Sequence, residues 1–357
     1  MTWKCGAMKH SITVYPHDKI APCGVMLGDF LVNINEINNP NRFDHLMGSE
    51  YPPKACEKCA VAIHDGVSPH KDSYNDVDEN KGIQHLDLRL SNRCNLKCRY
   101  CHPTYSNLWA KELAITPELQ EVDIEPYLDT LITDDLTNVY FTGGEPMLIP
   151  QHWLMLTKLI ETGYAKNIEL MYNSNMTTLR YKDVDVFELW SQFKSVNIVA
   201  SIDATNSFND FIRSGSRWSQ IEKNLREAAE RPNINLTIAC TVTILNIWQL
   251  DKFSKYCWDN GYSVSYSILR GPDYLAVDVI PDELKEHALS ILDRIEPDCA
   301  EVNAIKQMVV NNRNQYLIDQ TIRHVLLLDN IRNENLFQLL PFMEIAKERT
   351  LNNHEYK

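Results

Sequence analysis

Short apolar runs alternate with longer amphipathic segments through the middle of the chain. The runs are rich in aliphatic and aromatic residues, which is typical of buried strands. They predict six strands, at Gln84–Leu90, Asn138–Thr142, Ile168–Asn173, Val196–Ile202, Asn235–Val242 and Val264–Leu269. Apolar residues recur at helical spacing between them, in Tyr105–Ile132, Gln151–Thr162, Lys182–Phe193, Trp218–Glu230 and Ile247–Asn260. This alternation predicts a parallel sheet with right-handed crossovers.

The segment before this alternation has a different pattern. Ser11–Tyr15 predicts a short strand and Ile20–Cys23 a return strand after a turn, so a hairpin is expected. Ser68–Gly82 is polar and poor in apolar residues, which is typical of a linker. We therefore expect a small domain over residues 1–79, followed by an α/β domain over residues 80–280.

The last part of the chain, residues 281–357, shows helical spacing of apolar residues throughout. Leu284–Ile295 and Ala304–Leu328 are predicted helices, and a final helix is broken near Pro341. This helical extension is expected to pack on the rest of the chain.

Composition narrows the class of protein. Of 357 residues, 44% are apolar and 23% are charged, which are ordinary globular values. The net charge of −13 disfavours a broad nucleic-acid-binding face. No apolar run is long enough to span a bilayer, and the N-terminus MTWKCGAMKH lacks the apolar core of a signal peptide. A cytoplasmic protein without a membrane partner is expected.

The ten cysteines, in a chain without a recognisable secretion signal, favour metal ligation over disulfides. Cys94, Cys98 and Cys101 form a C-x3-C-x2-C triplet directly after the first predicted strand. Three thiolates are one ligand short of a closed zinc site or a fully ligated iron–sulfur cube. Such a centre keeps an open position where a substrate or cofactor binds. Three buried thiols, or a zinc ion with a distant fourth ligand, are the alternatives.

Four earlier cysteines form a set of their own. Cys5, Cys23 and the pair Cys56-x2-Cys59 would fully ligate one metal centre, either an iron–sulfur cluster or a zinc ion. A small, loop-rich segment has little apolar mass, so a metal centre would help to stabilise it.

Polar motifs follow the second, third and fourth predicted strands. They are Gly143-Gly144-Glu145, Ser174-Asn175 and Ser201-Ile202-Asp203, and Arg213 comes shortly afterwards. Functional residues of barrels lie at the carboxyl ends of strands, and glycines let the backbone approach a ligand closely. An arginine can bind a carboxylate through two hydrogen bonds. Each motif also fits an ordinary turn or helix cap.

The triplet, with Tyr100 directly before its last cysteine, resembles the hallmark C-x3-C-x-aromatic-C of radical S-adenosylmethionine (radical SAM) enzymes. The resemblance implies a partial (β/α)6 TIM-like barrel. It also implies that Cys94, Cys98 and Cys101 hold a [4Fe-4S] cluster whose fourth iron is chelated by the amino and carboxylate groups of S-adenosylmethionine (SAM).

The same resemblance implies roles for the strand-end motifs. Gly143-Gly144-Glu145 looks like the GGE motif that binds the amino group of SAM. Ser174-Asn175 resembles the family's NG turn, with Met176 where glycine is commoner. Ser201 and Asp203 would meet the ribose and carboxylate of SAM, and Arg213 its carboxylate. Tyr100 and Thr243–Asn246 would lie near the adenine.

The pattern of Cys5, Cys23, Cys56 and Cys59 resembles the SPASM and twitch modules of the same superfamily. Those modules hold an auxiliary [4Fe-4S] cluster, and in most members they follow the barrel instead of preceding it. A second, auxiliary [4Fe-4S] cluster in a small N-terminal cysteine-rich domain is therefore expected.

The implied activity is reductive cleavage of SAM to a 5′-deoxyadenosyl radical, which abstracts hydrogen from a substrate. An electron donor such as a flavodoxin or ferredoxin is expected as a partner. Oxidative modification of a peptide or protein is the expected outcome, with alcohol or sugar dehydrogenation and RNA modification as alternatives. A non-catalytic protein with two structural zinc sites is the alternative from another class. No side chain in the sequence stands out as a general base.

Overall fold

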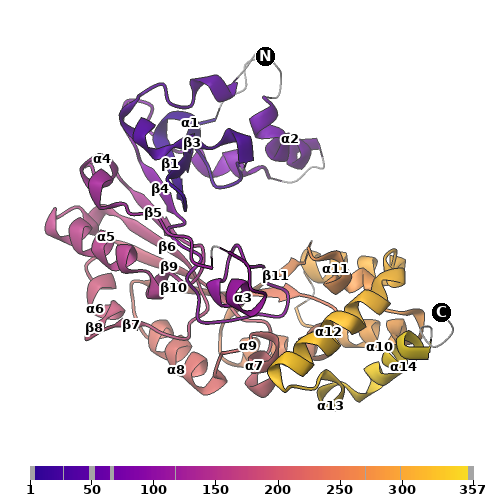
Figure 1. The fold of residues 1–357 in the computed structure, drawn as a ribbon. Coiled ribbons are helices and arrows are strands. Elements are labelled where there is room, and N and C mark those ends of the chain that lie inside the picture. Colours follow the sequence, from indigo (N-terminus) through magenta and orange to yellow (C-terminus); the bar gives the residue numbers. More distant parts are fainter. Residues whose placement is uncertain are drawn as a thin grey trace.

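The computed structural model describes residues 5–26, 28–47, 53–64, 68–116, 118–269, 271–297 and 299–352 (Figure 1). Six parallel strands lie in sequence order in one sheet. They are β4 (His85–Leu88), β5 (Asn138–Phe141), β6 (Glu169–Ser174), β9 (Ser195–Ser201), β10 (Ile234–Val242) and β11 (Ser263–Ile268). Each lies within two residues of its predicted bounds. The mixed α/β class with a mostly parallel sheet is thus confirmed, while the (β/α)6 barrel stays a prediction.

Helices connect these strands. They are α3 (Asn107–Glu112), α4 (Leu128–Leu131), α5 (Pro150–Glu161), α6 (Val186–Trp190), α7 (Asn206–Ile212), α8 (Trp218–Ala229) and α9 (Leu250–Asp259). The prediction of a helical Tyr105–Ile132 was wrong in extent, because Ala114 adopts a left-handed backbone (φ 53°) just after α3. The predicted helix at Lys182–Phe193 is shorter too. Its first residues belong to a hairpin of β7 (Arg180–Tyr181) and β8 (Val184–Asp185).

The N-terminal hairpin is present and extends the same sheet. Strand β1 (Ser11–Tyr15) pairs antiparallel with β2 (Lys19–Ala21), which pairs with β3 (Val32–Asn33). Strand β1 also pairs in parallel with β4, so the nine-stranded order is β11-β10-β9-β6-β5-β4-β1-β2-β3. Two short helices, α1 (Ala7–His10) and α2 (Glu57–His64), accompany these strands. The division of the chain at residue 79 stays a prediction, although this sheet is continuous across it.

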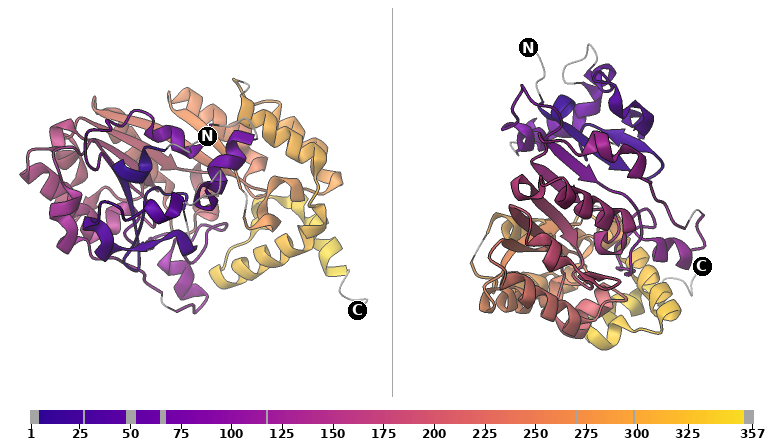
Figure 2. Two further views of the ribbon diagram at one scale, coloured as in Figure 1. Left: turned by 90° about the horizontal axis from the view of Figure 1, so that it is seen from above. Right: turned by 90° about the vertical axis from the view of Figure 1, so that its left-hand side faces the viewer.

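Among the described residues, five α-helices follow the last strand: α10 (Asp282–Leu292), α11 (Ala300–Asn311), α12 (Ile318–Arg332), α13 (Leu336–Leu339) and α14 (Glu344–Asn352). The single predicted helix Ala304–Leu328 is therefore two helices. Asn312 ends α11 with a positive φ of 27°, and its amide donates to the carbonyl of Ile280 at 3.2 Å. Figure 2 shows these helices at the opposite end of the sheet from the N-terminal strands. Among the described residues, none of the helices combines the length and apolar character needed to cross a bilayer.

The two faces of the parallel sheet differ. Phe141 and Tyr172 point into a fully buried aromatic cluster with His152 of α5 and Trp190 of α6. The alternate residues, such as Tyr140, Met171, Asn173 and Asn197, are half-buried or exposed. Because successive side chains of a strand point to opposite faces, one face packs on helices and the other stays accessible.

The Tyr172 hydroxyl joins this aromatic cluster. It lies 2.9 Å from His152 Nε2 and accepts from Trp190 Nε1 at 3.1 Å. Burial lowers the pKa of His152 to about 3, so its ring is neutral. We expect Tyr172→Phe to lower the free energy of unfolding by about 2–4 kcal/mol, because two buried polar groups lose their partner. Urea denaturation of the apo-protein measures this. Tyr316→Phe, at a 72% exposed tyrosine, is the matched control and should change little.

Candidate functional site

A cavity of about 250 Å³ lies at the carboxyl ends of the parallel strands, and the three cysteines of the triplet line it. Eight of the nine residues predicted to bind the cofactor line it as well: Tyr100, Gly143, Gly144, Glu145, Ser174, Asn175, Ser201 and Arg213. These residues come from five separate segments of the chain. Parallel pairing brings the segments together, since the carboxyl ends of neighbouring parallel strands meet at one edge of the sheet.

The thiols of the triplet lie in a desolvated environment. Burial raises the pKa of Cys94 to about 12 and raises that of Cys98 further, because a thiolate loses hydration there. Arg213 Nη1 lies 3.7 Å from Cys98 Sγ, and the Leu96 amide donates to Cys94 Sγ at 3.4 Å. These groups are suited to thiolates, and a bound metal would supply the remaining compensation, since coordination deprotonates a thiol.

The glycines of the GGE turn pack against the loop between β4 and α3, residues 89–106, which carries the triplet and is called the cysteine loop below. Gly144 donates its amide to the Ser91 carbonyl at 2.8 Å, and Glu145 donates its amide to the Arg93 carbonyl at 2.7 Å. A Cβ added at Gly144 would lie 2.1 Å from the Arg93 carbonyl oxygen. Glycine is therefore required here for backbone contact with the loop, a constraint that the sequence interpretation had assigned to a ligand. Both glycines also line the cavity.

The Glu145 carboxylate is buried at the wall of the cavity. It accepts from the Ser174 hydroxyl at 2.9 Å and from the Asn175 amide at 2.7 Å. Burial raises its pKa to about 7, and these two donors act in the opposite direction. Met176 has φ 56°, the left-handed conformation that glycine adopts most easily. The turn thus keeps the backbone shape of a glycine turn with a buried methionine.

Asp203 is the ninth of these residues and does not line the cavity. Its Oδ2 accepts from the Tyr100 hydroxyl at 2.6 Å and lies 2.7 Å from Arg213 Nε. Arg213 Nη2 donates to the same Tyr100 hydroxyl at 2.7 Å. Asp203 therefore orients Tyr100 and Arg213, which line the cavity, from a position outside it. Thr243 and Asn246, expected near an adenine, are buried outside the cavity and bonded to each other.

Sequence reasoning missed several residues of the cavity wall, namely Leu96, Tyr105, Thr142, Asn173 and Thr241. The alternation of side chains along a strand could have identified Asn173 and Thr241, because both lie near the end of a strand on the accessible face of the sheet. It also missed Asn95, whose side-chain Oδ1 accepts from the side-chain Nδ2 of Asn175 at 2.9 Å and so joins the cysteine loop to the residue after β6.

The other four cysteines line a second, small cavity between the N-terminal hairpin and α2. They are Cys5, Cys23, Cys56 and Cys59. Burial raises the pKa of Cys23 to about 12, and the other three sulfurs add to this shift. Within the described ranges, no three His, Cys, Asp or Glu side chains are spaced to hold a metal ion. A cubane cluster does not require such spacing, because each of its cysteines binds a different iron. The four cysteines around one cavity are therefore compatible with a cluster.

Residues 88–257 match the family model of the Radical SAM superfamily, a span of just under half the chain. This segment contains the triplet and the GGE turn, and it is similar to the radical SAM superfamily.

Three curated relatives are similar to parts of the chain. An uncharacterized protein of Methanocaldococcus jannaschii (MJ0907) is 27% identical over 60% of this chain and 68% of its own length. The 7-carboxy-7-deazaguanine synthase of Methanothermobacter thermautotrophicus is 31% identical over 36% of this chain. The sporulation killing factor maturation protein SkfB of Bacillus subtilis is 22% identical over 49% of this chain. The matches span only 45% and 39% of the last two proteins.

Among solved structures, native anSMEcpe with bound AdoMet aligns with a TM-score of 0.40 at 19% identity, over 51% of each chain. That TM-score is too low to support an inference about function.

The contact between the GGE turn and the cysteine loop gives a testable prediction. Gly144→Ala should lower the rate of the SAM cleavage that the radical SAM resemblance implies about a hundredfold, because the turn and the loop must move apart. The 5′-deoxyadenosine formed with dithionite measures this. Gly82→Ala is the control, since its added Cβ would meet only the Asp135 side chain, at 3.1 Å. Equal rates of cleavage for the two variants would contradict the conclusion that the contact of Gly144 with the cysteine loop matters for the site.

Proposed function

We propose that this chain is a radical SAM enzyme that oxidatively modifies a peptide or protein. Cys94, Cys98 and Cys101 would hold a [4Fe-4S] cluster with one open iron, and SAM would bind beside it. One observation carries the proposal: the three thiols of the triplet and the Glu145 carboxylate line a single cavity, with no fourth cysteine among its lining residues.

The residues of the cavity fit these two groups. Three thiols supply all the protein ligands of a cluster whose last position belongs to SAM. Glu145 can accept hydrogen bonds from the SAM ammonium, and Arg213 can donate to its carboxylate. Ser201, at the end of β9, is a hydroxyl suited to the ribose. Together, the cluster and SAM supply a radical that abstracts hydrogen from the substrate.

The chain's own part is to position these groups and exclude water. Tyr100 and Arg213 are held by the Asp203 carboxylate, which is itself 1% exposed. Glu145 is equally buried and fixed by two donors. Groups fixed in this way need little reorganisation when a ligand binds, which is the protein's usual contribution to cofactor chemistry.

The peptide or protein substrate class is favoured by the resemblance to a maturation protein of a killing factor. The accessible face of the sheet, with Tyr140, Asn173 and Asn197, offers polar side chains to a substrate. The 31% identical relative is named as a synthase of a deazaguanine, which favours a small-molecule substrate as the second candidate.

We further propose that Cys5, Cys23, Cys56 and Cys59 hold an auxiliary [4Fe-4S] cluster, because all four line one small cavity. It could accept an electron from the substrate or stabilise the N-terminal segment. An electron donor such as a flavodoxin or ferredoxin would reduce the cluster of the triplet. Two structural zinc ions are the rival assignment, and the metal content distinguishes them.

Metal analysis and two variants test this assignment. Anaerobically purified protein should be brown, absorb near roughly 400 nm and contain about eight irons. Cys98→Ala should abolish 5′-deoxyadenosine formation, because the SAM-binding cluster loses a ligand. Cys56→Ala should keep some SAM cleavage, retain about four irons and lose the coupled product. A colourless protein with two zinc ions would end the proposal.

The raised pKa of Glu145 predicts a pH dependence of SAM binding. A carboxyl with a pKa of about 7 is ionised above that pH, and only about a tenth remains ionised at pH 6. Because the carboxylate form accepts from the SAM ammonium, affinity should fall about tenfold between pH 8 and pH 6. Anaerobic equilibrium dialysis with labelled SAM measures this.

Glu145→Gln should bind SAM weakly with a flat profile between these pH values. Glu121→Gln is the matched control, since Glu121 pairs with Arg93 at 2.8 Å and is absent from the cavity wall. It should keep the wild-type profile. A Glu145→Gln protein with an unchanged pH dependence would contradict the role of this carboxylate.

A further inference from the structure

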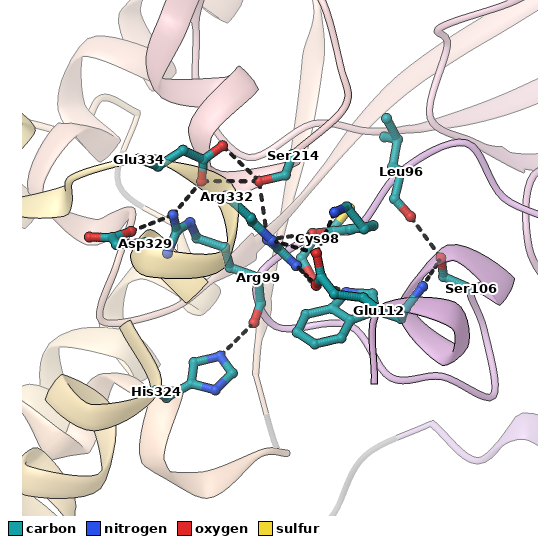
Figure 3. Close-up of polar contacts among 12 residues, drawn as sticks. Leu96, Cys98, Arg99, Ser106, Glu112, Ser214, His324, Asp329, Arg332 and Glu334 are labelled. Carbon is teal, nitrogen blue, oxygen red and sulfur yellow. Dashed lines mark hydrogen bonds and ion pairs between the residues drawn. The ribbon is translucent and has the colours of Figure 1, made fainter. Parts of the chain in front are cut away.

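The loop that carries the triplet is held by residues from the far end of the chain (Figure 3). The carbonyls of Lys97, Cys98 and Arg99 each accept a hydrogen bond from a side chain. The donors are Arg332 Nη1 at 3.0 Å, Trp109 Nε1 at 2.8 Å and His324 Nε2 at 3.1 Å. Arg332 and His324 belong to α12, more than 220 residues after the loop.

Trp109 of α3, the third donor, is itself fixed by α12. Its ring stacks on His324 with centroids 6.5 Å apart, and the Arg332 guanidinium lies 4.8 Å from its ring centroid. All three carbonyl contacts therefore depend on the placement of one helix.

The charged side chains around this contact are balanced. Lys97, Arg99 and Arg332 supply three cations, and three carboxylates pair with them: Glu112, Asp329 and Glu334. Arg332 Nη2 donates to Glu112 at 2.7 Å, and Arg99 Nη2 donates to Asp329 at 2.6 Å and also to Glu334. The Arg99 side chain is 0% exposed. Removing a single partner from such a group leaves a buried charge unpaired, which is costly.

The loop amides are bound from the other side. Lys97 and Arg99 donate their N–H groups to the carbonyls of Ser214 and Ile212, both at 2.8 Å. Arg332 Nη1 also donates to the Ser214 hydroxyl at 3.1 Å. The end of α7, the residues after it and helix α12 thus hold the loop between them, and Arg332 contacts both the loop and Ser214.

We propose that His324, Asp329, Arg332 and Glu334 form a C-terminal clasp that positions the cysteine loop for cluster binding. The clasp lies outside residues 88–257, the part of the chain that matches the family model. The helical extension therefore contributes residues that hold the cysteine loop, in addition to packing on the rest of the chain. The contacts of the clasp are observed between residues of the protein itself. That they position the loop for a cluster rests on the proposed function.

Thiol labelling of the apo-protein tests the clasp without a cluster. Cys98 is only 8% exposed, so iodoacetamide reaches it mainly when the loop opens. With metal chelated and thiols reduced, Arg332→Gln should raise the labelling rate of Cys98 at least about tenfold, measured by peptide mass spectrometry. Arg332→Lys keeps the charge but not the forked geometry and should give an intermediate rate.

Arg294→Gln is the matched control. Arg294 also belongs to the C-terminal extension. It pairs with Asp251 at 2.8 Å and donates to the Ser290 carbonyl at 2.8 Å, and neither partner belongs to the cysteine loop. Its substitution should leave the labelling rate unchanged. His324→Phe is a second variant, because it keeps a ring against Trp109 while removing the donor to Arg99. It should raise labelling even if Arg332→Gln does not fold.

Iron and sulfide content separates this proposal from the proposed function. In reconstituted protein, Arg332→Gln should retain about half of the wild-type iron, since only the triplet's cluster is affected. If both variants label Cys98 at the wild-type rate, the clasp is wrong whatever metal is bound. If labelling rises but the wild-type protein binds no iron, the proposed function fails and the clasp remains as a feature of the loop.

Discussion

The parallel pairing of β4, β5, β6 and β9 is the constraint on which the site depends. Each strand delivers one short polar segment to the same edge of the sheet, and none of these segments would meet without the pairing. The close approach is then set by backbone contacts, above all that of Gly144 with the loop carbonyl of Arg93. This packing removes water from the thiols and from the Glu145 carboxylate, and their raised pKa values follow from that loss of hydration.

The elements that sequence predicted well are those with a local signal. The six parallel strands were found because apolar runs and polar strand ends repeat in the chain, and the triplet because its spacing is short. The same reasoning singled out Glu145, Ser174 and Ser201 as cofactor-binding residues, and these three residues line one cavity. Met176 looked like a departure from a glycine turn, yet its φ of 56° shows that the turn kept its shape.

The elements that sequence could not predict are held by distant partners. Asp203 follows a strand, as expected of a ligand contact, but it does not line the cavity, and its carboxylate is bonded to Tyr100 and Arg213. Nothing near Arg332 in the sequence indicates that it binds the carbonyl of Lys97. The break between α11 and α12 likewise depends on Asn312 bonding to Ile280, a contact with another segment. The local periodicity of apolar residues does not indicate such contacts, because they join residues that are distant in sequence and meet only in the folded chain.

The pairing of β1 with β4 has a consequence for the two sets of cysteines. Ser11 lies opposite His85 and Val14 opposite Leu88, so the hairpin that leads to Cys23 is in fixed register with the strand that leads to Cys94. A shift of one residue would turn Ile12 and Val14 away from the core, and a shift of two would move the hairpin by about 7 Å. Strand register, and not the length of the chain between β2 and β4, therefore sets the separation of the two sets. Insertions in that intervening chain would leave the separation unchanged as long as the register is kept.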